Sequence, residues 1–322
     1  MKTALNYDDV YKRQDVYLVP NKCTLDTRSD ASTFCMLGED TSHSRVFNLP
    51  IVPANMQTTI DFKWAKELDA GGYFYIMHRF NNITIPFVEF ATDNGMSNIS
   101  ISTGVSEQSR AEIKSLAGRD INFVTIDIAH GHSDLVARQI ECIKQNLPNT
   151  YIIAGNVATP EAVEFLENCG ANAVKVGIGS GIICTTKLQT GFHVPMFTCI
   201  SDCIQGARQV DIIADGGVKH FGDIAKAIVA GADMVMAGGI FAGCSDSPAQ
   251  VINGKKMYYG STSYTAKQEN NHIEGRTLSV EVESDLKTRL HEITQALQSS
   301  ISYAGGNNLK ALKSGVKYYT SR

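Results

Sequence analysis

The sequence lacks the features that direct a chain into or across a membrane. No apolar run reaches the roughly 20 residues that a membrane-spanning helix needs, because glycine or polar residues interrupt every such run. The first twenty residues, MKTALNYDDVYKRQDVYLVP, contain acids and bases throughout and no apolar core of a signal peptide. We therefore expect an intracellular, cytoplasmic protein without a membrane partner.

The chain also lacks an excess of basic residues. Its 29 lysines and arginines are outnumbered by 33 aspartates and glutamates, so the formal net charge is -4. Nucleic-acid-binding domains carry clustered positive charge, so this composition argues against a nucleic-acid partner. The eight cysteines are irregularly spaced, and Cys199 and Cys203 have no second pair or histidines at zinc-finger spacing. Reduced thiols are expected, without a zinc site.

One pattern repeats from residue 49 to residue 240. A short apolar, β-branched run is followed by a glycine or polar turn and then by a stretch with apolar residues three or four apart. Such runs occur at 49–56, 73–78, 99–105, 123–131, 151–157, 173–181, 211–218 and 234–240. Eight buried strands alternating with helices predict an α/β fold, a closed (β/α)₈ TIM barrel. A doubly wound open sheet is the alternative, but its glycine fingerprint is missing after the first run.

We assign residues 1–322 to a single barrel domain with its core at about 49–245. Residues 1–48 form an N-terminal extension, a polar segment at about 257–276 is expected to be a catalytic flap, and 277–322 form a helical tail. Thr159 followed by Pro160 predicts a helix start, and Gly170 and Gly231 predict helix ends.

Polar residues close several of the predicted strands, at the end of a barrel where chemistry gathers. They are Asn55, Gln57, Asp127, His130, His132, Asn156, Cys184 and Asp215. Any one of them alone is explained as well by helix capping or loop hydrogen bonding. The two histidines lack a carboxylate-rich helix nearby, so we expect loop hydrogen bonds from them and a cavity-facing side chain from Asp127.

Two glycine pairs follow the last two predicted strands. They are Gly216 with Gly217 and Gly238 with Gly239. The loops after these strands bind phosphate in many barrels, because bare backbone N–H groups and helix N-termini close on an anion. Tight turns would explain either pair singly, but the two pairs together favour a phosphorylated ligand.

Cys184 follows the glycine-rich stretch GIGSG and precedes Thr185 and Thr186. A buried, inert cysteine is the ordinary alternative. A thiol in a polar loop beside two hydroxyls instead suits attack on an electron-poor sp² carbon, once its proton is removed.

The motifs of nearly the whole chain, in order, resemble those of the IMP dehydrogenase and GMP reductase family, and most closely the short bacterial reductases within it. They include YLVPNKCTLDTRSD, PIVPANMQT, YIMHRF, TIDIAHGHSD, AGNVATPE, GIGSGIICTTK, IADGGVKHFGDIAKAIVAGADMVMAGG, YYGSTS, IEGR and LQSSISYAGG. Only about 20 residues separate YIMHRF from ISTGV, which leaves no room for the CBS modules of the dehydrogenases. Residues 261–273 also lack the arginine of the dehydrogenase flap.

The resemblance implies NADPH-dependent conversion of GMP to IMP and ammonia, a step of purine nucleotide salvage. Cys184 would attack C2 of the purine to form a thioimidate intermediate, with Thr186 and Glu274 exchanging protons. The alternatives are an IMP dehydrogenase without CBS modules that oxidises IMP to XMP with NAD, a variant acting on a deoxynucleotide such as dGMP, and a non-catalytic nucleotide-binding homologue.

The resemblance also implies ligand-binding residues. Ribose and phosphate would be held by Asp215, Gly216, Gly217, Gly238 and Gly239, and the base would be bordered by Gly260, Ser261, Thr262 and Gly275. The nicotinamide end of the cofactor would meet Asp127, Ala129 and Arg79. Arg28, Ser299 and Ser300 would reach a neighbouring subunit's cofactor, which implies a homotetramer. Carbonyl groups of Gly179, Gly181 and Cys184 would bind a monovalent cation such as K⁺. Ser180 stands where the family usually has proline, and Ile182 where it usually has a small or polar residue.

Overall fold

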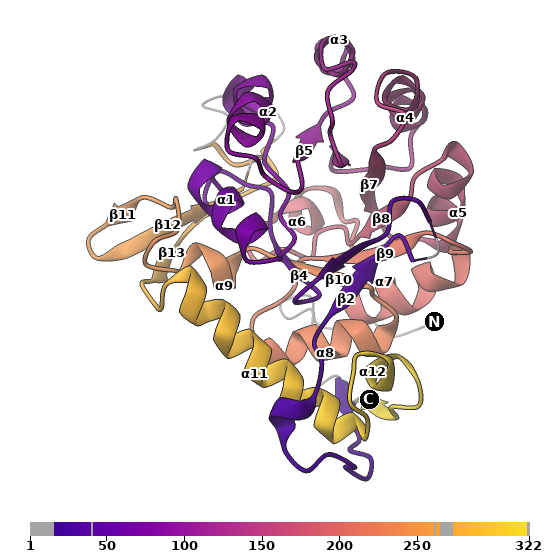
Figure 1. Ribbon diagram of the computed structural model, residues 1–322, viewed down its shortest axis with the longest axis vertical. Helices are drawn as coiled ribbons and strands as arrows, with labels where there is room; N and C mark the ends of the chain where they lie inside the picture. The colour runs from indigo at the N-terminus through magenta and orange to yellow at the C-terminus, as the bar shows by residue number, and fades with distance from the viewer. Residues whose placement is uncertain (1–15, 40, 261, 265–272, 321–322) are drawn as a thin grey trace.

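A computed structural model describes residues 16–39, 41–260, 262–264 and 273–320. Its central sheet has seven parallel strands in the order β4–β10–β9–β8–β7–β6–β5 (Figure 1). These are β4 (Ile51–Pro53), β5 (Ser100–Thr103), β6 (Phe123–Asp127), β7 (Tyr151–Val157), β8 (Ala173–Val176), β9 (Asp211–Asp215) and β10 (Met234–Ala237). Nearly all their residues are buried, as parallel strands covered on both faces require.

Helices follow the strands and lie around the outside of the sheet (Figure 1). They are α1 (Phe62–Ala70), α2 (Thr84–Asp93), α3 (Glu107–Ser115), α4 (Asp134–Asn146), α5 (Pro160–Cys169), α7 (Met196–Cys203), α8 (Phe221–Ala230) and α9 (Gly239–Ala242). The Thr159 side chain accepts a hydrogen bond from Ala162 N–H at the start of α5, and Gly170 ends that helix with φ of 103°. Gly231 ends α8 with φ of 121°. The three predicted helix boundaries are therefore confirmed.

The second predicted strand differs from the structure. Residues 73–78 are largely buried but form no regular strand among the described residues. Met77 N–H donates to Ser100 O over 3.1 Å, so the run lies beside β5. The Ser102 hydroxyl donates to Met77 O over 2.5 Å, so both backbone polar groups of Met77 bond to β5. The α/β barrel class is confirmed, with seven regular strands in the central sheet and this buried run beside β5.

Shorter elements build the extension and the flap base. Antiparallel pairs join β1 (Val16–Leu18) to β14 (Tyr318–Thr320) and β2 (Cys35–Leu37) to β3 (Arg45–Phe47). The predicted flap at about 257–276 lies partly outside the described residues. Next to it is an antiparallel sheet of β11 (Val251–Ile252), β12 (Lys255–Tyr259) and β13 (Thr277–Glu281). Single turns are η1 (Arg28–Asp30), η2 (Phe80–Asn82) and η3 (Ile204–Gly206).

The predicted tail, 277–322, contains two helices and two strands in its described part. The helices α11 (Leu286–Ala304) and α12 (Lys310–Lys313) lie between β13 and β14. The side chain of Asp285 accepts from Thr288 N–H and caps α11, which packs against α8 and η1. Within the described part of the chain, no helix combines the length and apolar character that crossing a membrane would take.

His78, at the end of the buried run, makes stability depend on pH. Its side chain is 7% exposed, its Nδ1 atom accepts from Phe80 N–H, and burial lowers its pKa to about 4. The unfolded chain keeps an ordinary histidine pKa near 6.5. The pKa of His78 is thus lower in the folded state than in the unfolded chain. The contribution of neutral His78 to the free energy of unfolding is therefore fully present above pH 6.5 and is lost as pH falls toward 4.

We therefore expect lowering the pH from 7 to 5 to cost the wild type about 2 kcal/mol more folding free energy than it costs His78→Gln. Thermal unfolding of both proteins at the two pH values measures the difference. Equal acid sensitivity in the two proteins would contradict a buried, neutral His78.

Candidate active site

Three side chains form a continuous hydrogen-bonded relay: two are close neighbours in the sequence, and the third lies 88 residues beyond Thr186. Cys184 lies in the loop after β8, and Thr186 begins the short helix α6 (Thr186–Thr190). The Cys184 thiol donates to Thr186 Oγ1 over 3.2 Å, and the Thr186 hydroxyl donates to Glu274 Oε2 over 2.5 Å. The relay connects a nucleophile, a hydroxyl and a proton acceptor, which is the arrangement that activates a weak nucleophile.

Backbone pairing holds Glu274 in this position. Cys184 and Gly275 form an isolated antiparallel bridge, and Thr185 N–H donates to Glu274 O over 2.8 Å. Arg276 N–H donates to Ile183 O over 2.9 Å, which extends the pairing by one residue. Residues 274–276 are therefore paired with the loop that carries Cys184, and these main-chain contacts set the relay geometry.

The relay opens into a cavity of about 240 Å³ at the carboxyl ends of the strands. Most of the residues predicted for the site line it: Arg79, Asp127, Ala129, Gly179, Gly181, Cys184, Thr186, Asp215, Gly216, Gly238, Gly260, Thr262, Glu274 and Gly275. Ser261 lies outside the described residues. Gln57, His130 and His132 are not among the described lining residues, although Asn55 and Asn156 are. His132 instead contacts the ring of Phe165.

A smaller hollow of about 100 Å³ adjoins the cavity and shares its rim at Gly216 and Gly238. Both predicted glycine pairs line it, together with Lys187, Lys219 and Arg276. A Cβ atom on Gly238 would lie 1.9 Å from the Tyr258 hydroxyl, so this approach requires glycine. Bare backbone and three cationic side chains make the hollow suitable for an anion.

Lys175 is a buried site residue that sequence reasoning missed. It is 2% exposed, and its ammonium group lies 2.8 Å from Asp127 Oδ1 and 2.7 Å from Asp215 Oδ2. Burial alone would lower the pKa of Lys175, but the two carboxylates outweigh it and raise that pKa above its ordinary value. A lone lysine within the apolar run AVKVG was the available signal.

The other wall of the cavity carries the residues expected at the cofactor. Arg79 Nη2 donates to Asp127 O over 3.3 Å, while the buried Arg79 Nε has no hydrogen-bond partner among the described residues. Burial would raise the pKa of Asp127, but Lys175 and Arg79 hold it below its ordinary value. Asn156 Nδ2 donates to Asp215 Oδ2 over 2.8 Å. This wall therefore carries an ionised carboxylate, Asp127, and an N–H donor of Arg79 that has no partner among the described residues.

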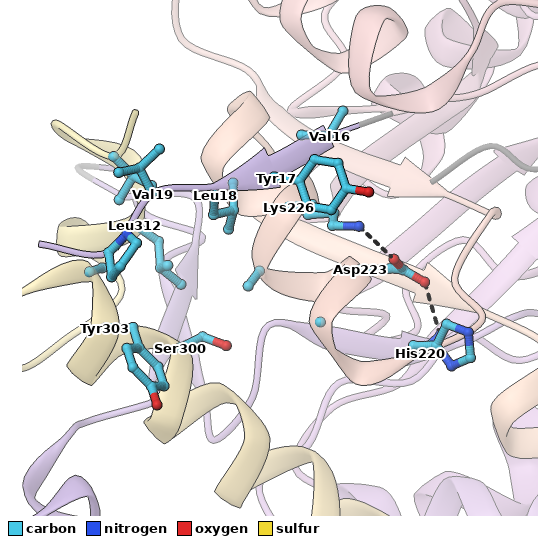
Figure 2. Close-up of a pocket in the computed structure, with 15 residues that line it drawn as sticks. Val16, Tyr17, Leu18, Val19, His220, Asp223, Lys226, Ser300, Tyr303 and Leu312 are labelled. Atoms are coloured by element: carbon cyan, nitrogen blue, oxygen red, sulfur yellow. Dashed lines mark hydrogen bonds and ion pairs between the residues drawn. The ribbon is translucent and has the colours of Figure 1, made fainter. Parts of the chain in front are cut away.

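Arg28, Ser299 and Ser300 lie apart from this cavity. Arg28 Nη1 donates to Ser299 Oγ over 3.4 Å, and the guanidinium stands 5.4 Å from the centre of the Tyr303 ring. Ser300 and Tyr303 line a separate groove of about 490 Å³, drawn in Figure 2, between α11, α8 and β1. The three predicted residues therefore lie near one another at this groove, away from the cavity that contains Cys184.

The two departures from the family pattern are both structurally accommodated. Ser180 is 6% exposed, and its hydroxyl donates to Asp215 O over 2.6 Å. Ile182 is 42% exposed, and its carbonyl accepts from Arg276 Nε and Nη2 over 3.1 and 2.9 Å. The Ile182 side chain thus offers no polar contact to the hollow. The Ile182 carbonyl instead holds the guanidinium group of Arg276.

The predicted cation site uses backbone carbonyls and stays a prediction. Gly179 has φ of 72°, which favours glycine, and Gly181 O already accepts from Cys184 N–H over 3.0 Å. Across the described ranges, no group of three or more His, Cys, Asp or Glu side chains has the arrangement of a metal site. A cation here would therefore rely on main-chain oxygen atoms.

Comparison with known proteins gives one consistent result. Residues 10–321 match a family described as the IMP dehydrogenase / GMP reductase domain. The chain is 48% identical to the GMP reductase of Lysinibacillus sphaericus over 315 residues, 95% of this chain and 94% of the relative. It is 47% identical to the GMP reductase of Oceanobacillus iheyensis over 315 residues, with 95% and 94% covered. The GMP reductase of Streptococcus agalactiae is 48% identical over 311 residues, with 94% and 93% covered.

Proposed function

The chain belongs to the IMP dehydrogenase / GMP reductase family of oxidoreductases, and we propose that it converts GMP to IMP and ammonia with NADPH as reductant. The observation that carries this proposal is the relay from Cys184 through Thr186 to Glu274. The relay opens into a cavity that adjoins an anion-suited hollow. A nucleotide with its phosphate in the hollow would present its purine to the thiol.

The relay's own atoms account for the first half of the reaction. The Cys184 proton moves to the Thr186 oxygen while the Thr186 proton moves to Glu274, which leaves a thiolate. The sulfur bonds to C2 of the purine, and the 2-amino group leaves as ammonia with the proton that Glu274 received. A covalent Cys184–C2 intermediate remains, and the proton from the thiol is accounted for in the ammonia.

The second half of the reaction needs a reductant. NADPH, when bound, would supply the hydride that C2 needs. Cys184 would then leave C2 as a thiolate and take up a proton from solvent as IMP is released. The residues present fit such a cofactor, because the Arg79 Nε donor is unpartnered among described residues and Asp127 and Ala129 line the same wall. These side chains would orient the nicotinamide end toward the carbon bonded to Cys184.

The assembly proposed here is a homotetramer in which the groove of Figure 2 contributes to a neighbour's cofactor site. Arg28 and Ser299 lie next to the groove, and Ser300 and Tyr303 line it. A cationic side chain, hydroxyls and an aromatic ring suit the distal part of a phosphorylated cofactor. Binding of K⁺ by the cysteine loop and a cytoplasmic location are proposed with it.

A spectrophotometric assay of the purified protein tests the function. NADPH is expected to be oxidised with GMP present and to stay reduced without a nucleotide. Pairing dGMP with NADPH in the same assay determines whether a deoxynucleotide is preferred. Reduction of NAD with IMP, in place of NADPH oxidation with GMP, would identify the dehydrogenase reaction and refute the proposal.

A further inference from the structure

Three residues on neighbouring strands lie in one row across the barrel interior. Asp127 on β6 pairs in register with Gly155 on β7, and Gly155 pairs in turn with Lys175 on β8. A Cβ atom added to Gly155 would lie 2.5 Å from the Lys175 Cβ atom. Because Gly155 has no side chain, Lys175 can extend across β7 to a carboxylate two strands away.

Lys175 contacts a second carboxylate, Asp215 on β9, with the same ammonium group. Asp127 and Asp215 each keep 21% of their side chains exposed, and both line the cavity. Lys175 and Asn156 donate to the same oxygen of Asp215, and no hydrogen bond from a described residue reaches the other. The lysine thus holds both carboxylates while leaving acceptor capacity toward the cavity.

We propose that Lys175 is a positioning residue shared by the nucleotide and cofactor halves of the site. This inference rests on the proposed function, in which Asp215 meets the nucleotide ribose and Asp127 meets the nicotinamide end of the cofactor. Without the ammonium, two carboxylates at this depth would repel each other, and one would turn away or take up a proton. Two different ligands therefore depend for their affinity on one side chain.

Another buried lysine, Lys256, serves as the control for Lys175, because it lies away from the ligand-facing groups. Its side chain is 3% exposed, and its Nζ atom donates to Ser247 O over 2.7 Å. Neither Lys256 nor Ser247 lines the cavity or the adjoining hollow. Lys256→Met is therefore a matched control, because it removes a buried ammonium without touching a ligand-facing group.

The experiment is calorimetric titration of the complete protein with GMP and, separately, with NADPH. Lys175→Met is expected to raise the Kd of both ligands by about tenfold or more, because it leaves buried charges unpaired. Lys175→Arg keeps the charge, so both of its Kd values should be lower than those of Lys175→Met. Lys256→Met should lower the melting temperature and leave both Kd values unchanged.

A double variant keeps the test decisive if Lys175→Met does not fold. Lys175→Met combined with Asp127→Asn restores the net charge of the wild-type cluster. It should bind GMP more tightly than Lys175→Met, where that variant is measurable, and about threefold more weakly than Asp127→Asn alone. Equal GMP affinity in the double variant and in Asp127→Asn would overturn the proposal.

The binding measurements separate the proposed function from the role of Lys175. Wild-type protein that binds neither GMP nor NADPH would refute the proposed function. Wild-type protein that binds both ligands, together with a Lys175→Met variant that binds them equally tightly, would refute the role of Lys175 and leave the function standing.

Discussion

Cys184→Ala is expected to abolish turnover while leaving GMP affinity within about threefold of the wild-type value. Alanine preserves the backbone bridge between residue 184 and Gly275, so the cavity keeps its shape. Because the bond to C2 requires a thiolate, kcat should fall by about four orders of magnitude or more. NADPH absorbance gives the rate, and calorimetric titration gives the GMP affinity.

Cys169→Ala is the matched control for this prediction. Cys169 is a partly exposed cysteine at the end of α5 and does not line the cavity or the adjoining hollow. Its replacement should leave kcat unchanged. A Cys184→Ala protein that retained more than about one hundredth of the wild-type rate would show that the thiol is not the nucleophile.

Glu274→Gln is expected to reduce kcat by about 10²- to 10⁴-fold with little change in GMP affinity. The glutamine keeps an oxygen that can accept from the Thr186 hydroxyl, but it cannot take up a proton. The loss should therefore appear in the transition state and spare ground-state binding. Steady-state kinetics with GMP as the varied nucleotide separate the two effects.

The relay itself is tested by adding a second substitution. Thr186→Val removes the hydroxyl that connects Cys184 to Glu274. If the three residues act as one unit, the double variant Thr186→Val/Glu274→Gln should be barely slower than the slower single variant. Glu281→Gln on β13, whose carboxylate pairs with Lys255, controls for charge loss near the flap base. A defect of Glu274→Gln in GMP binding alone would mean that Glu274 only shapes the flap.

The part of the site that could be predicted from pattern alone is the part that barrel geometry determines. Parallel strands end at one rim, so Asp127, Cys184 and Asp215 could be expected near one another before any contact was known. Glu274 belongs to a polar segment whose place over the barrel no periodicity determines. It was assigned by family resemblance, and the structure brings it within hydrogen-bonding distance of Thr186.

Other features depended on information that apolar patterning does not carry. A buried run has the same apolar signature whether or not it forms a regular strand. At residues 73–78 the Met77 carbonyl accepts from the Ser102 side chain, a contact that apolar patterning does not reveal. Lys175 is the one charge in the apolar strand β8. Its role depends on Gly155, a residue of the neighbouring strand whose missing side chain opens the path to Asp127.

The most direct test of the central claim is the stoichiometry of the reaction. Purified protein is supplied with GMP and NADPH, and the NADPH oxidised, the ammonia released and the IMP formed are measured in the same samples. We predict one ammonia and one IMP for each NADPH oxidised by the wild type. Cys184→Ala should oxidise no NADPH and form neither ammonia nor IMP. NADPH oxidation without ammonia release, or equal product formation by Cys184→Ala, would contradict attack of Cys184 on C2 of GMP.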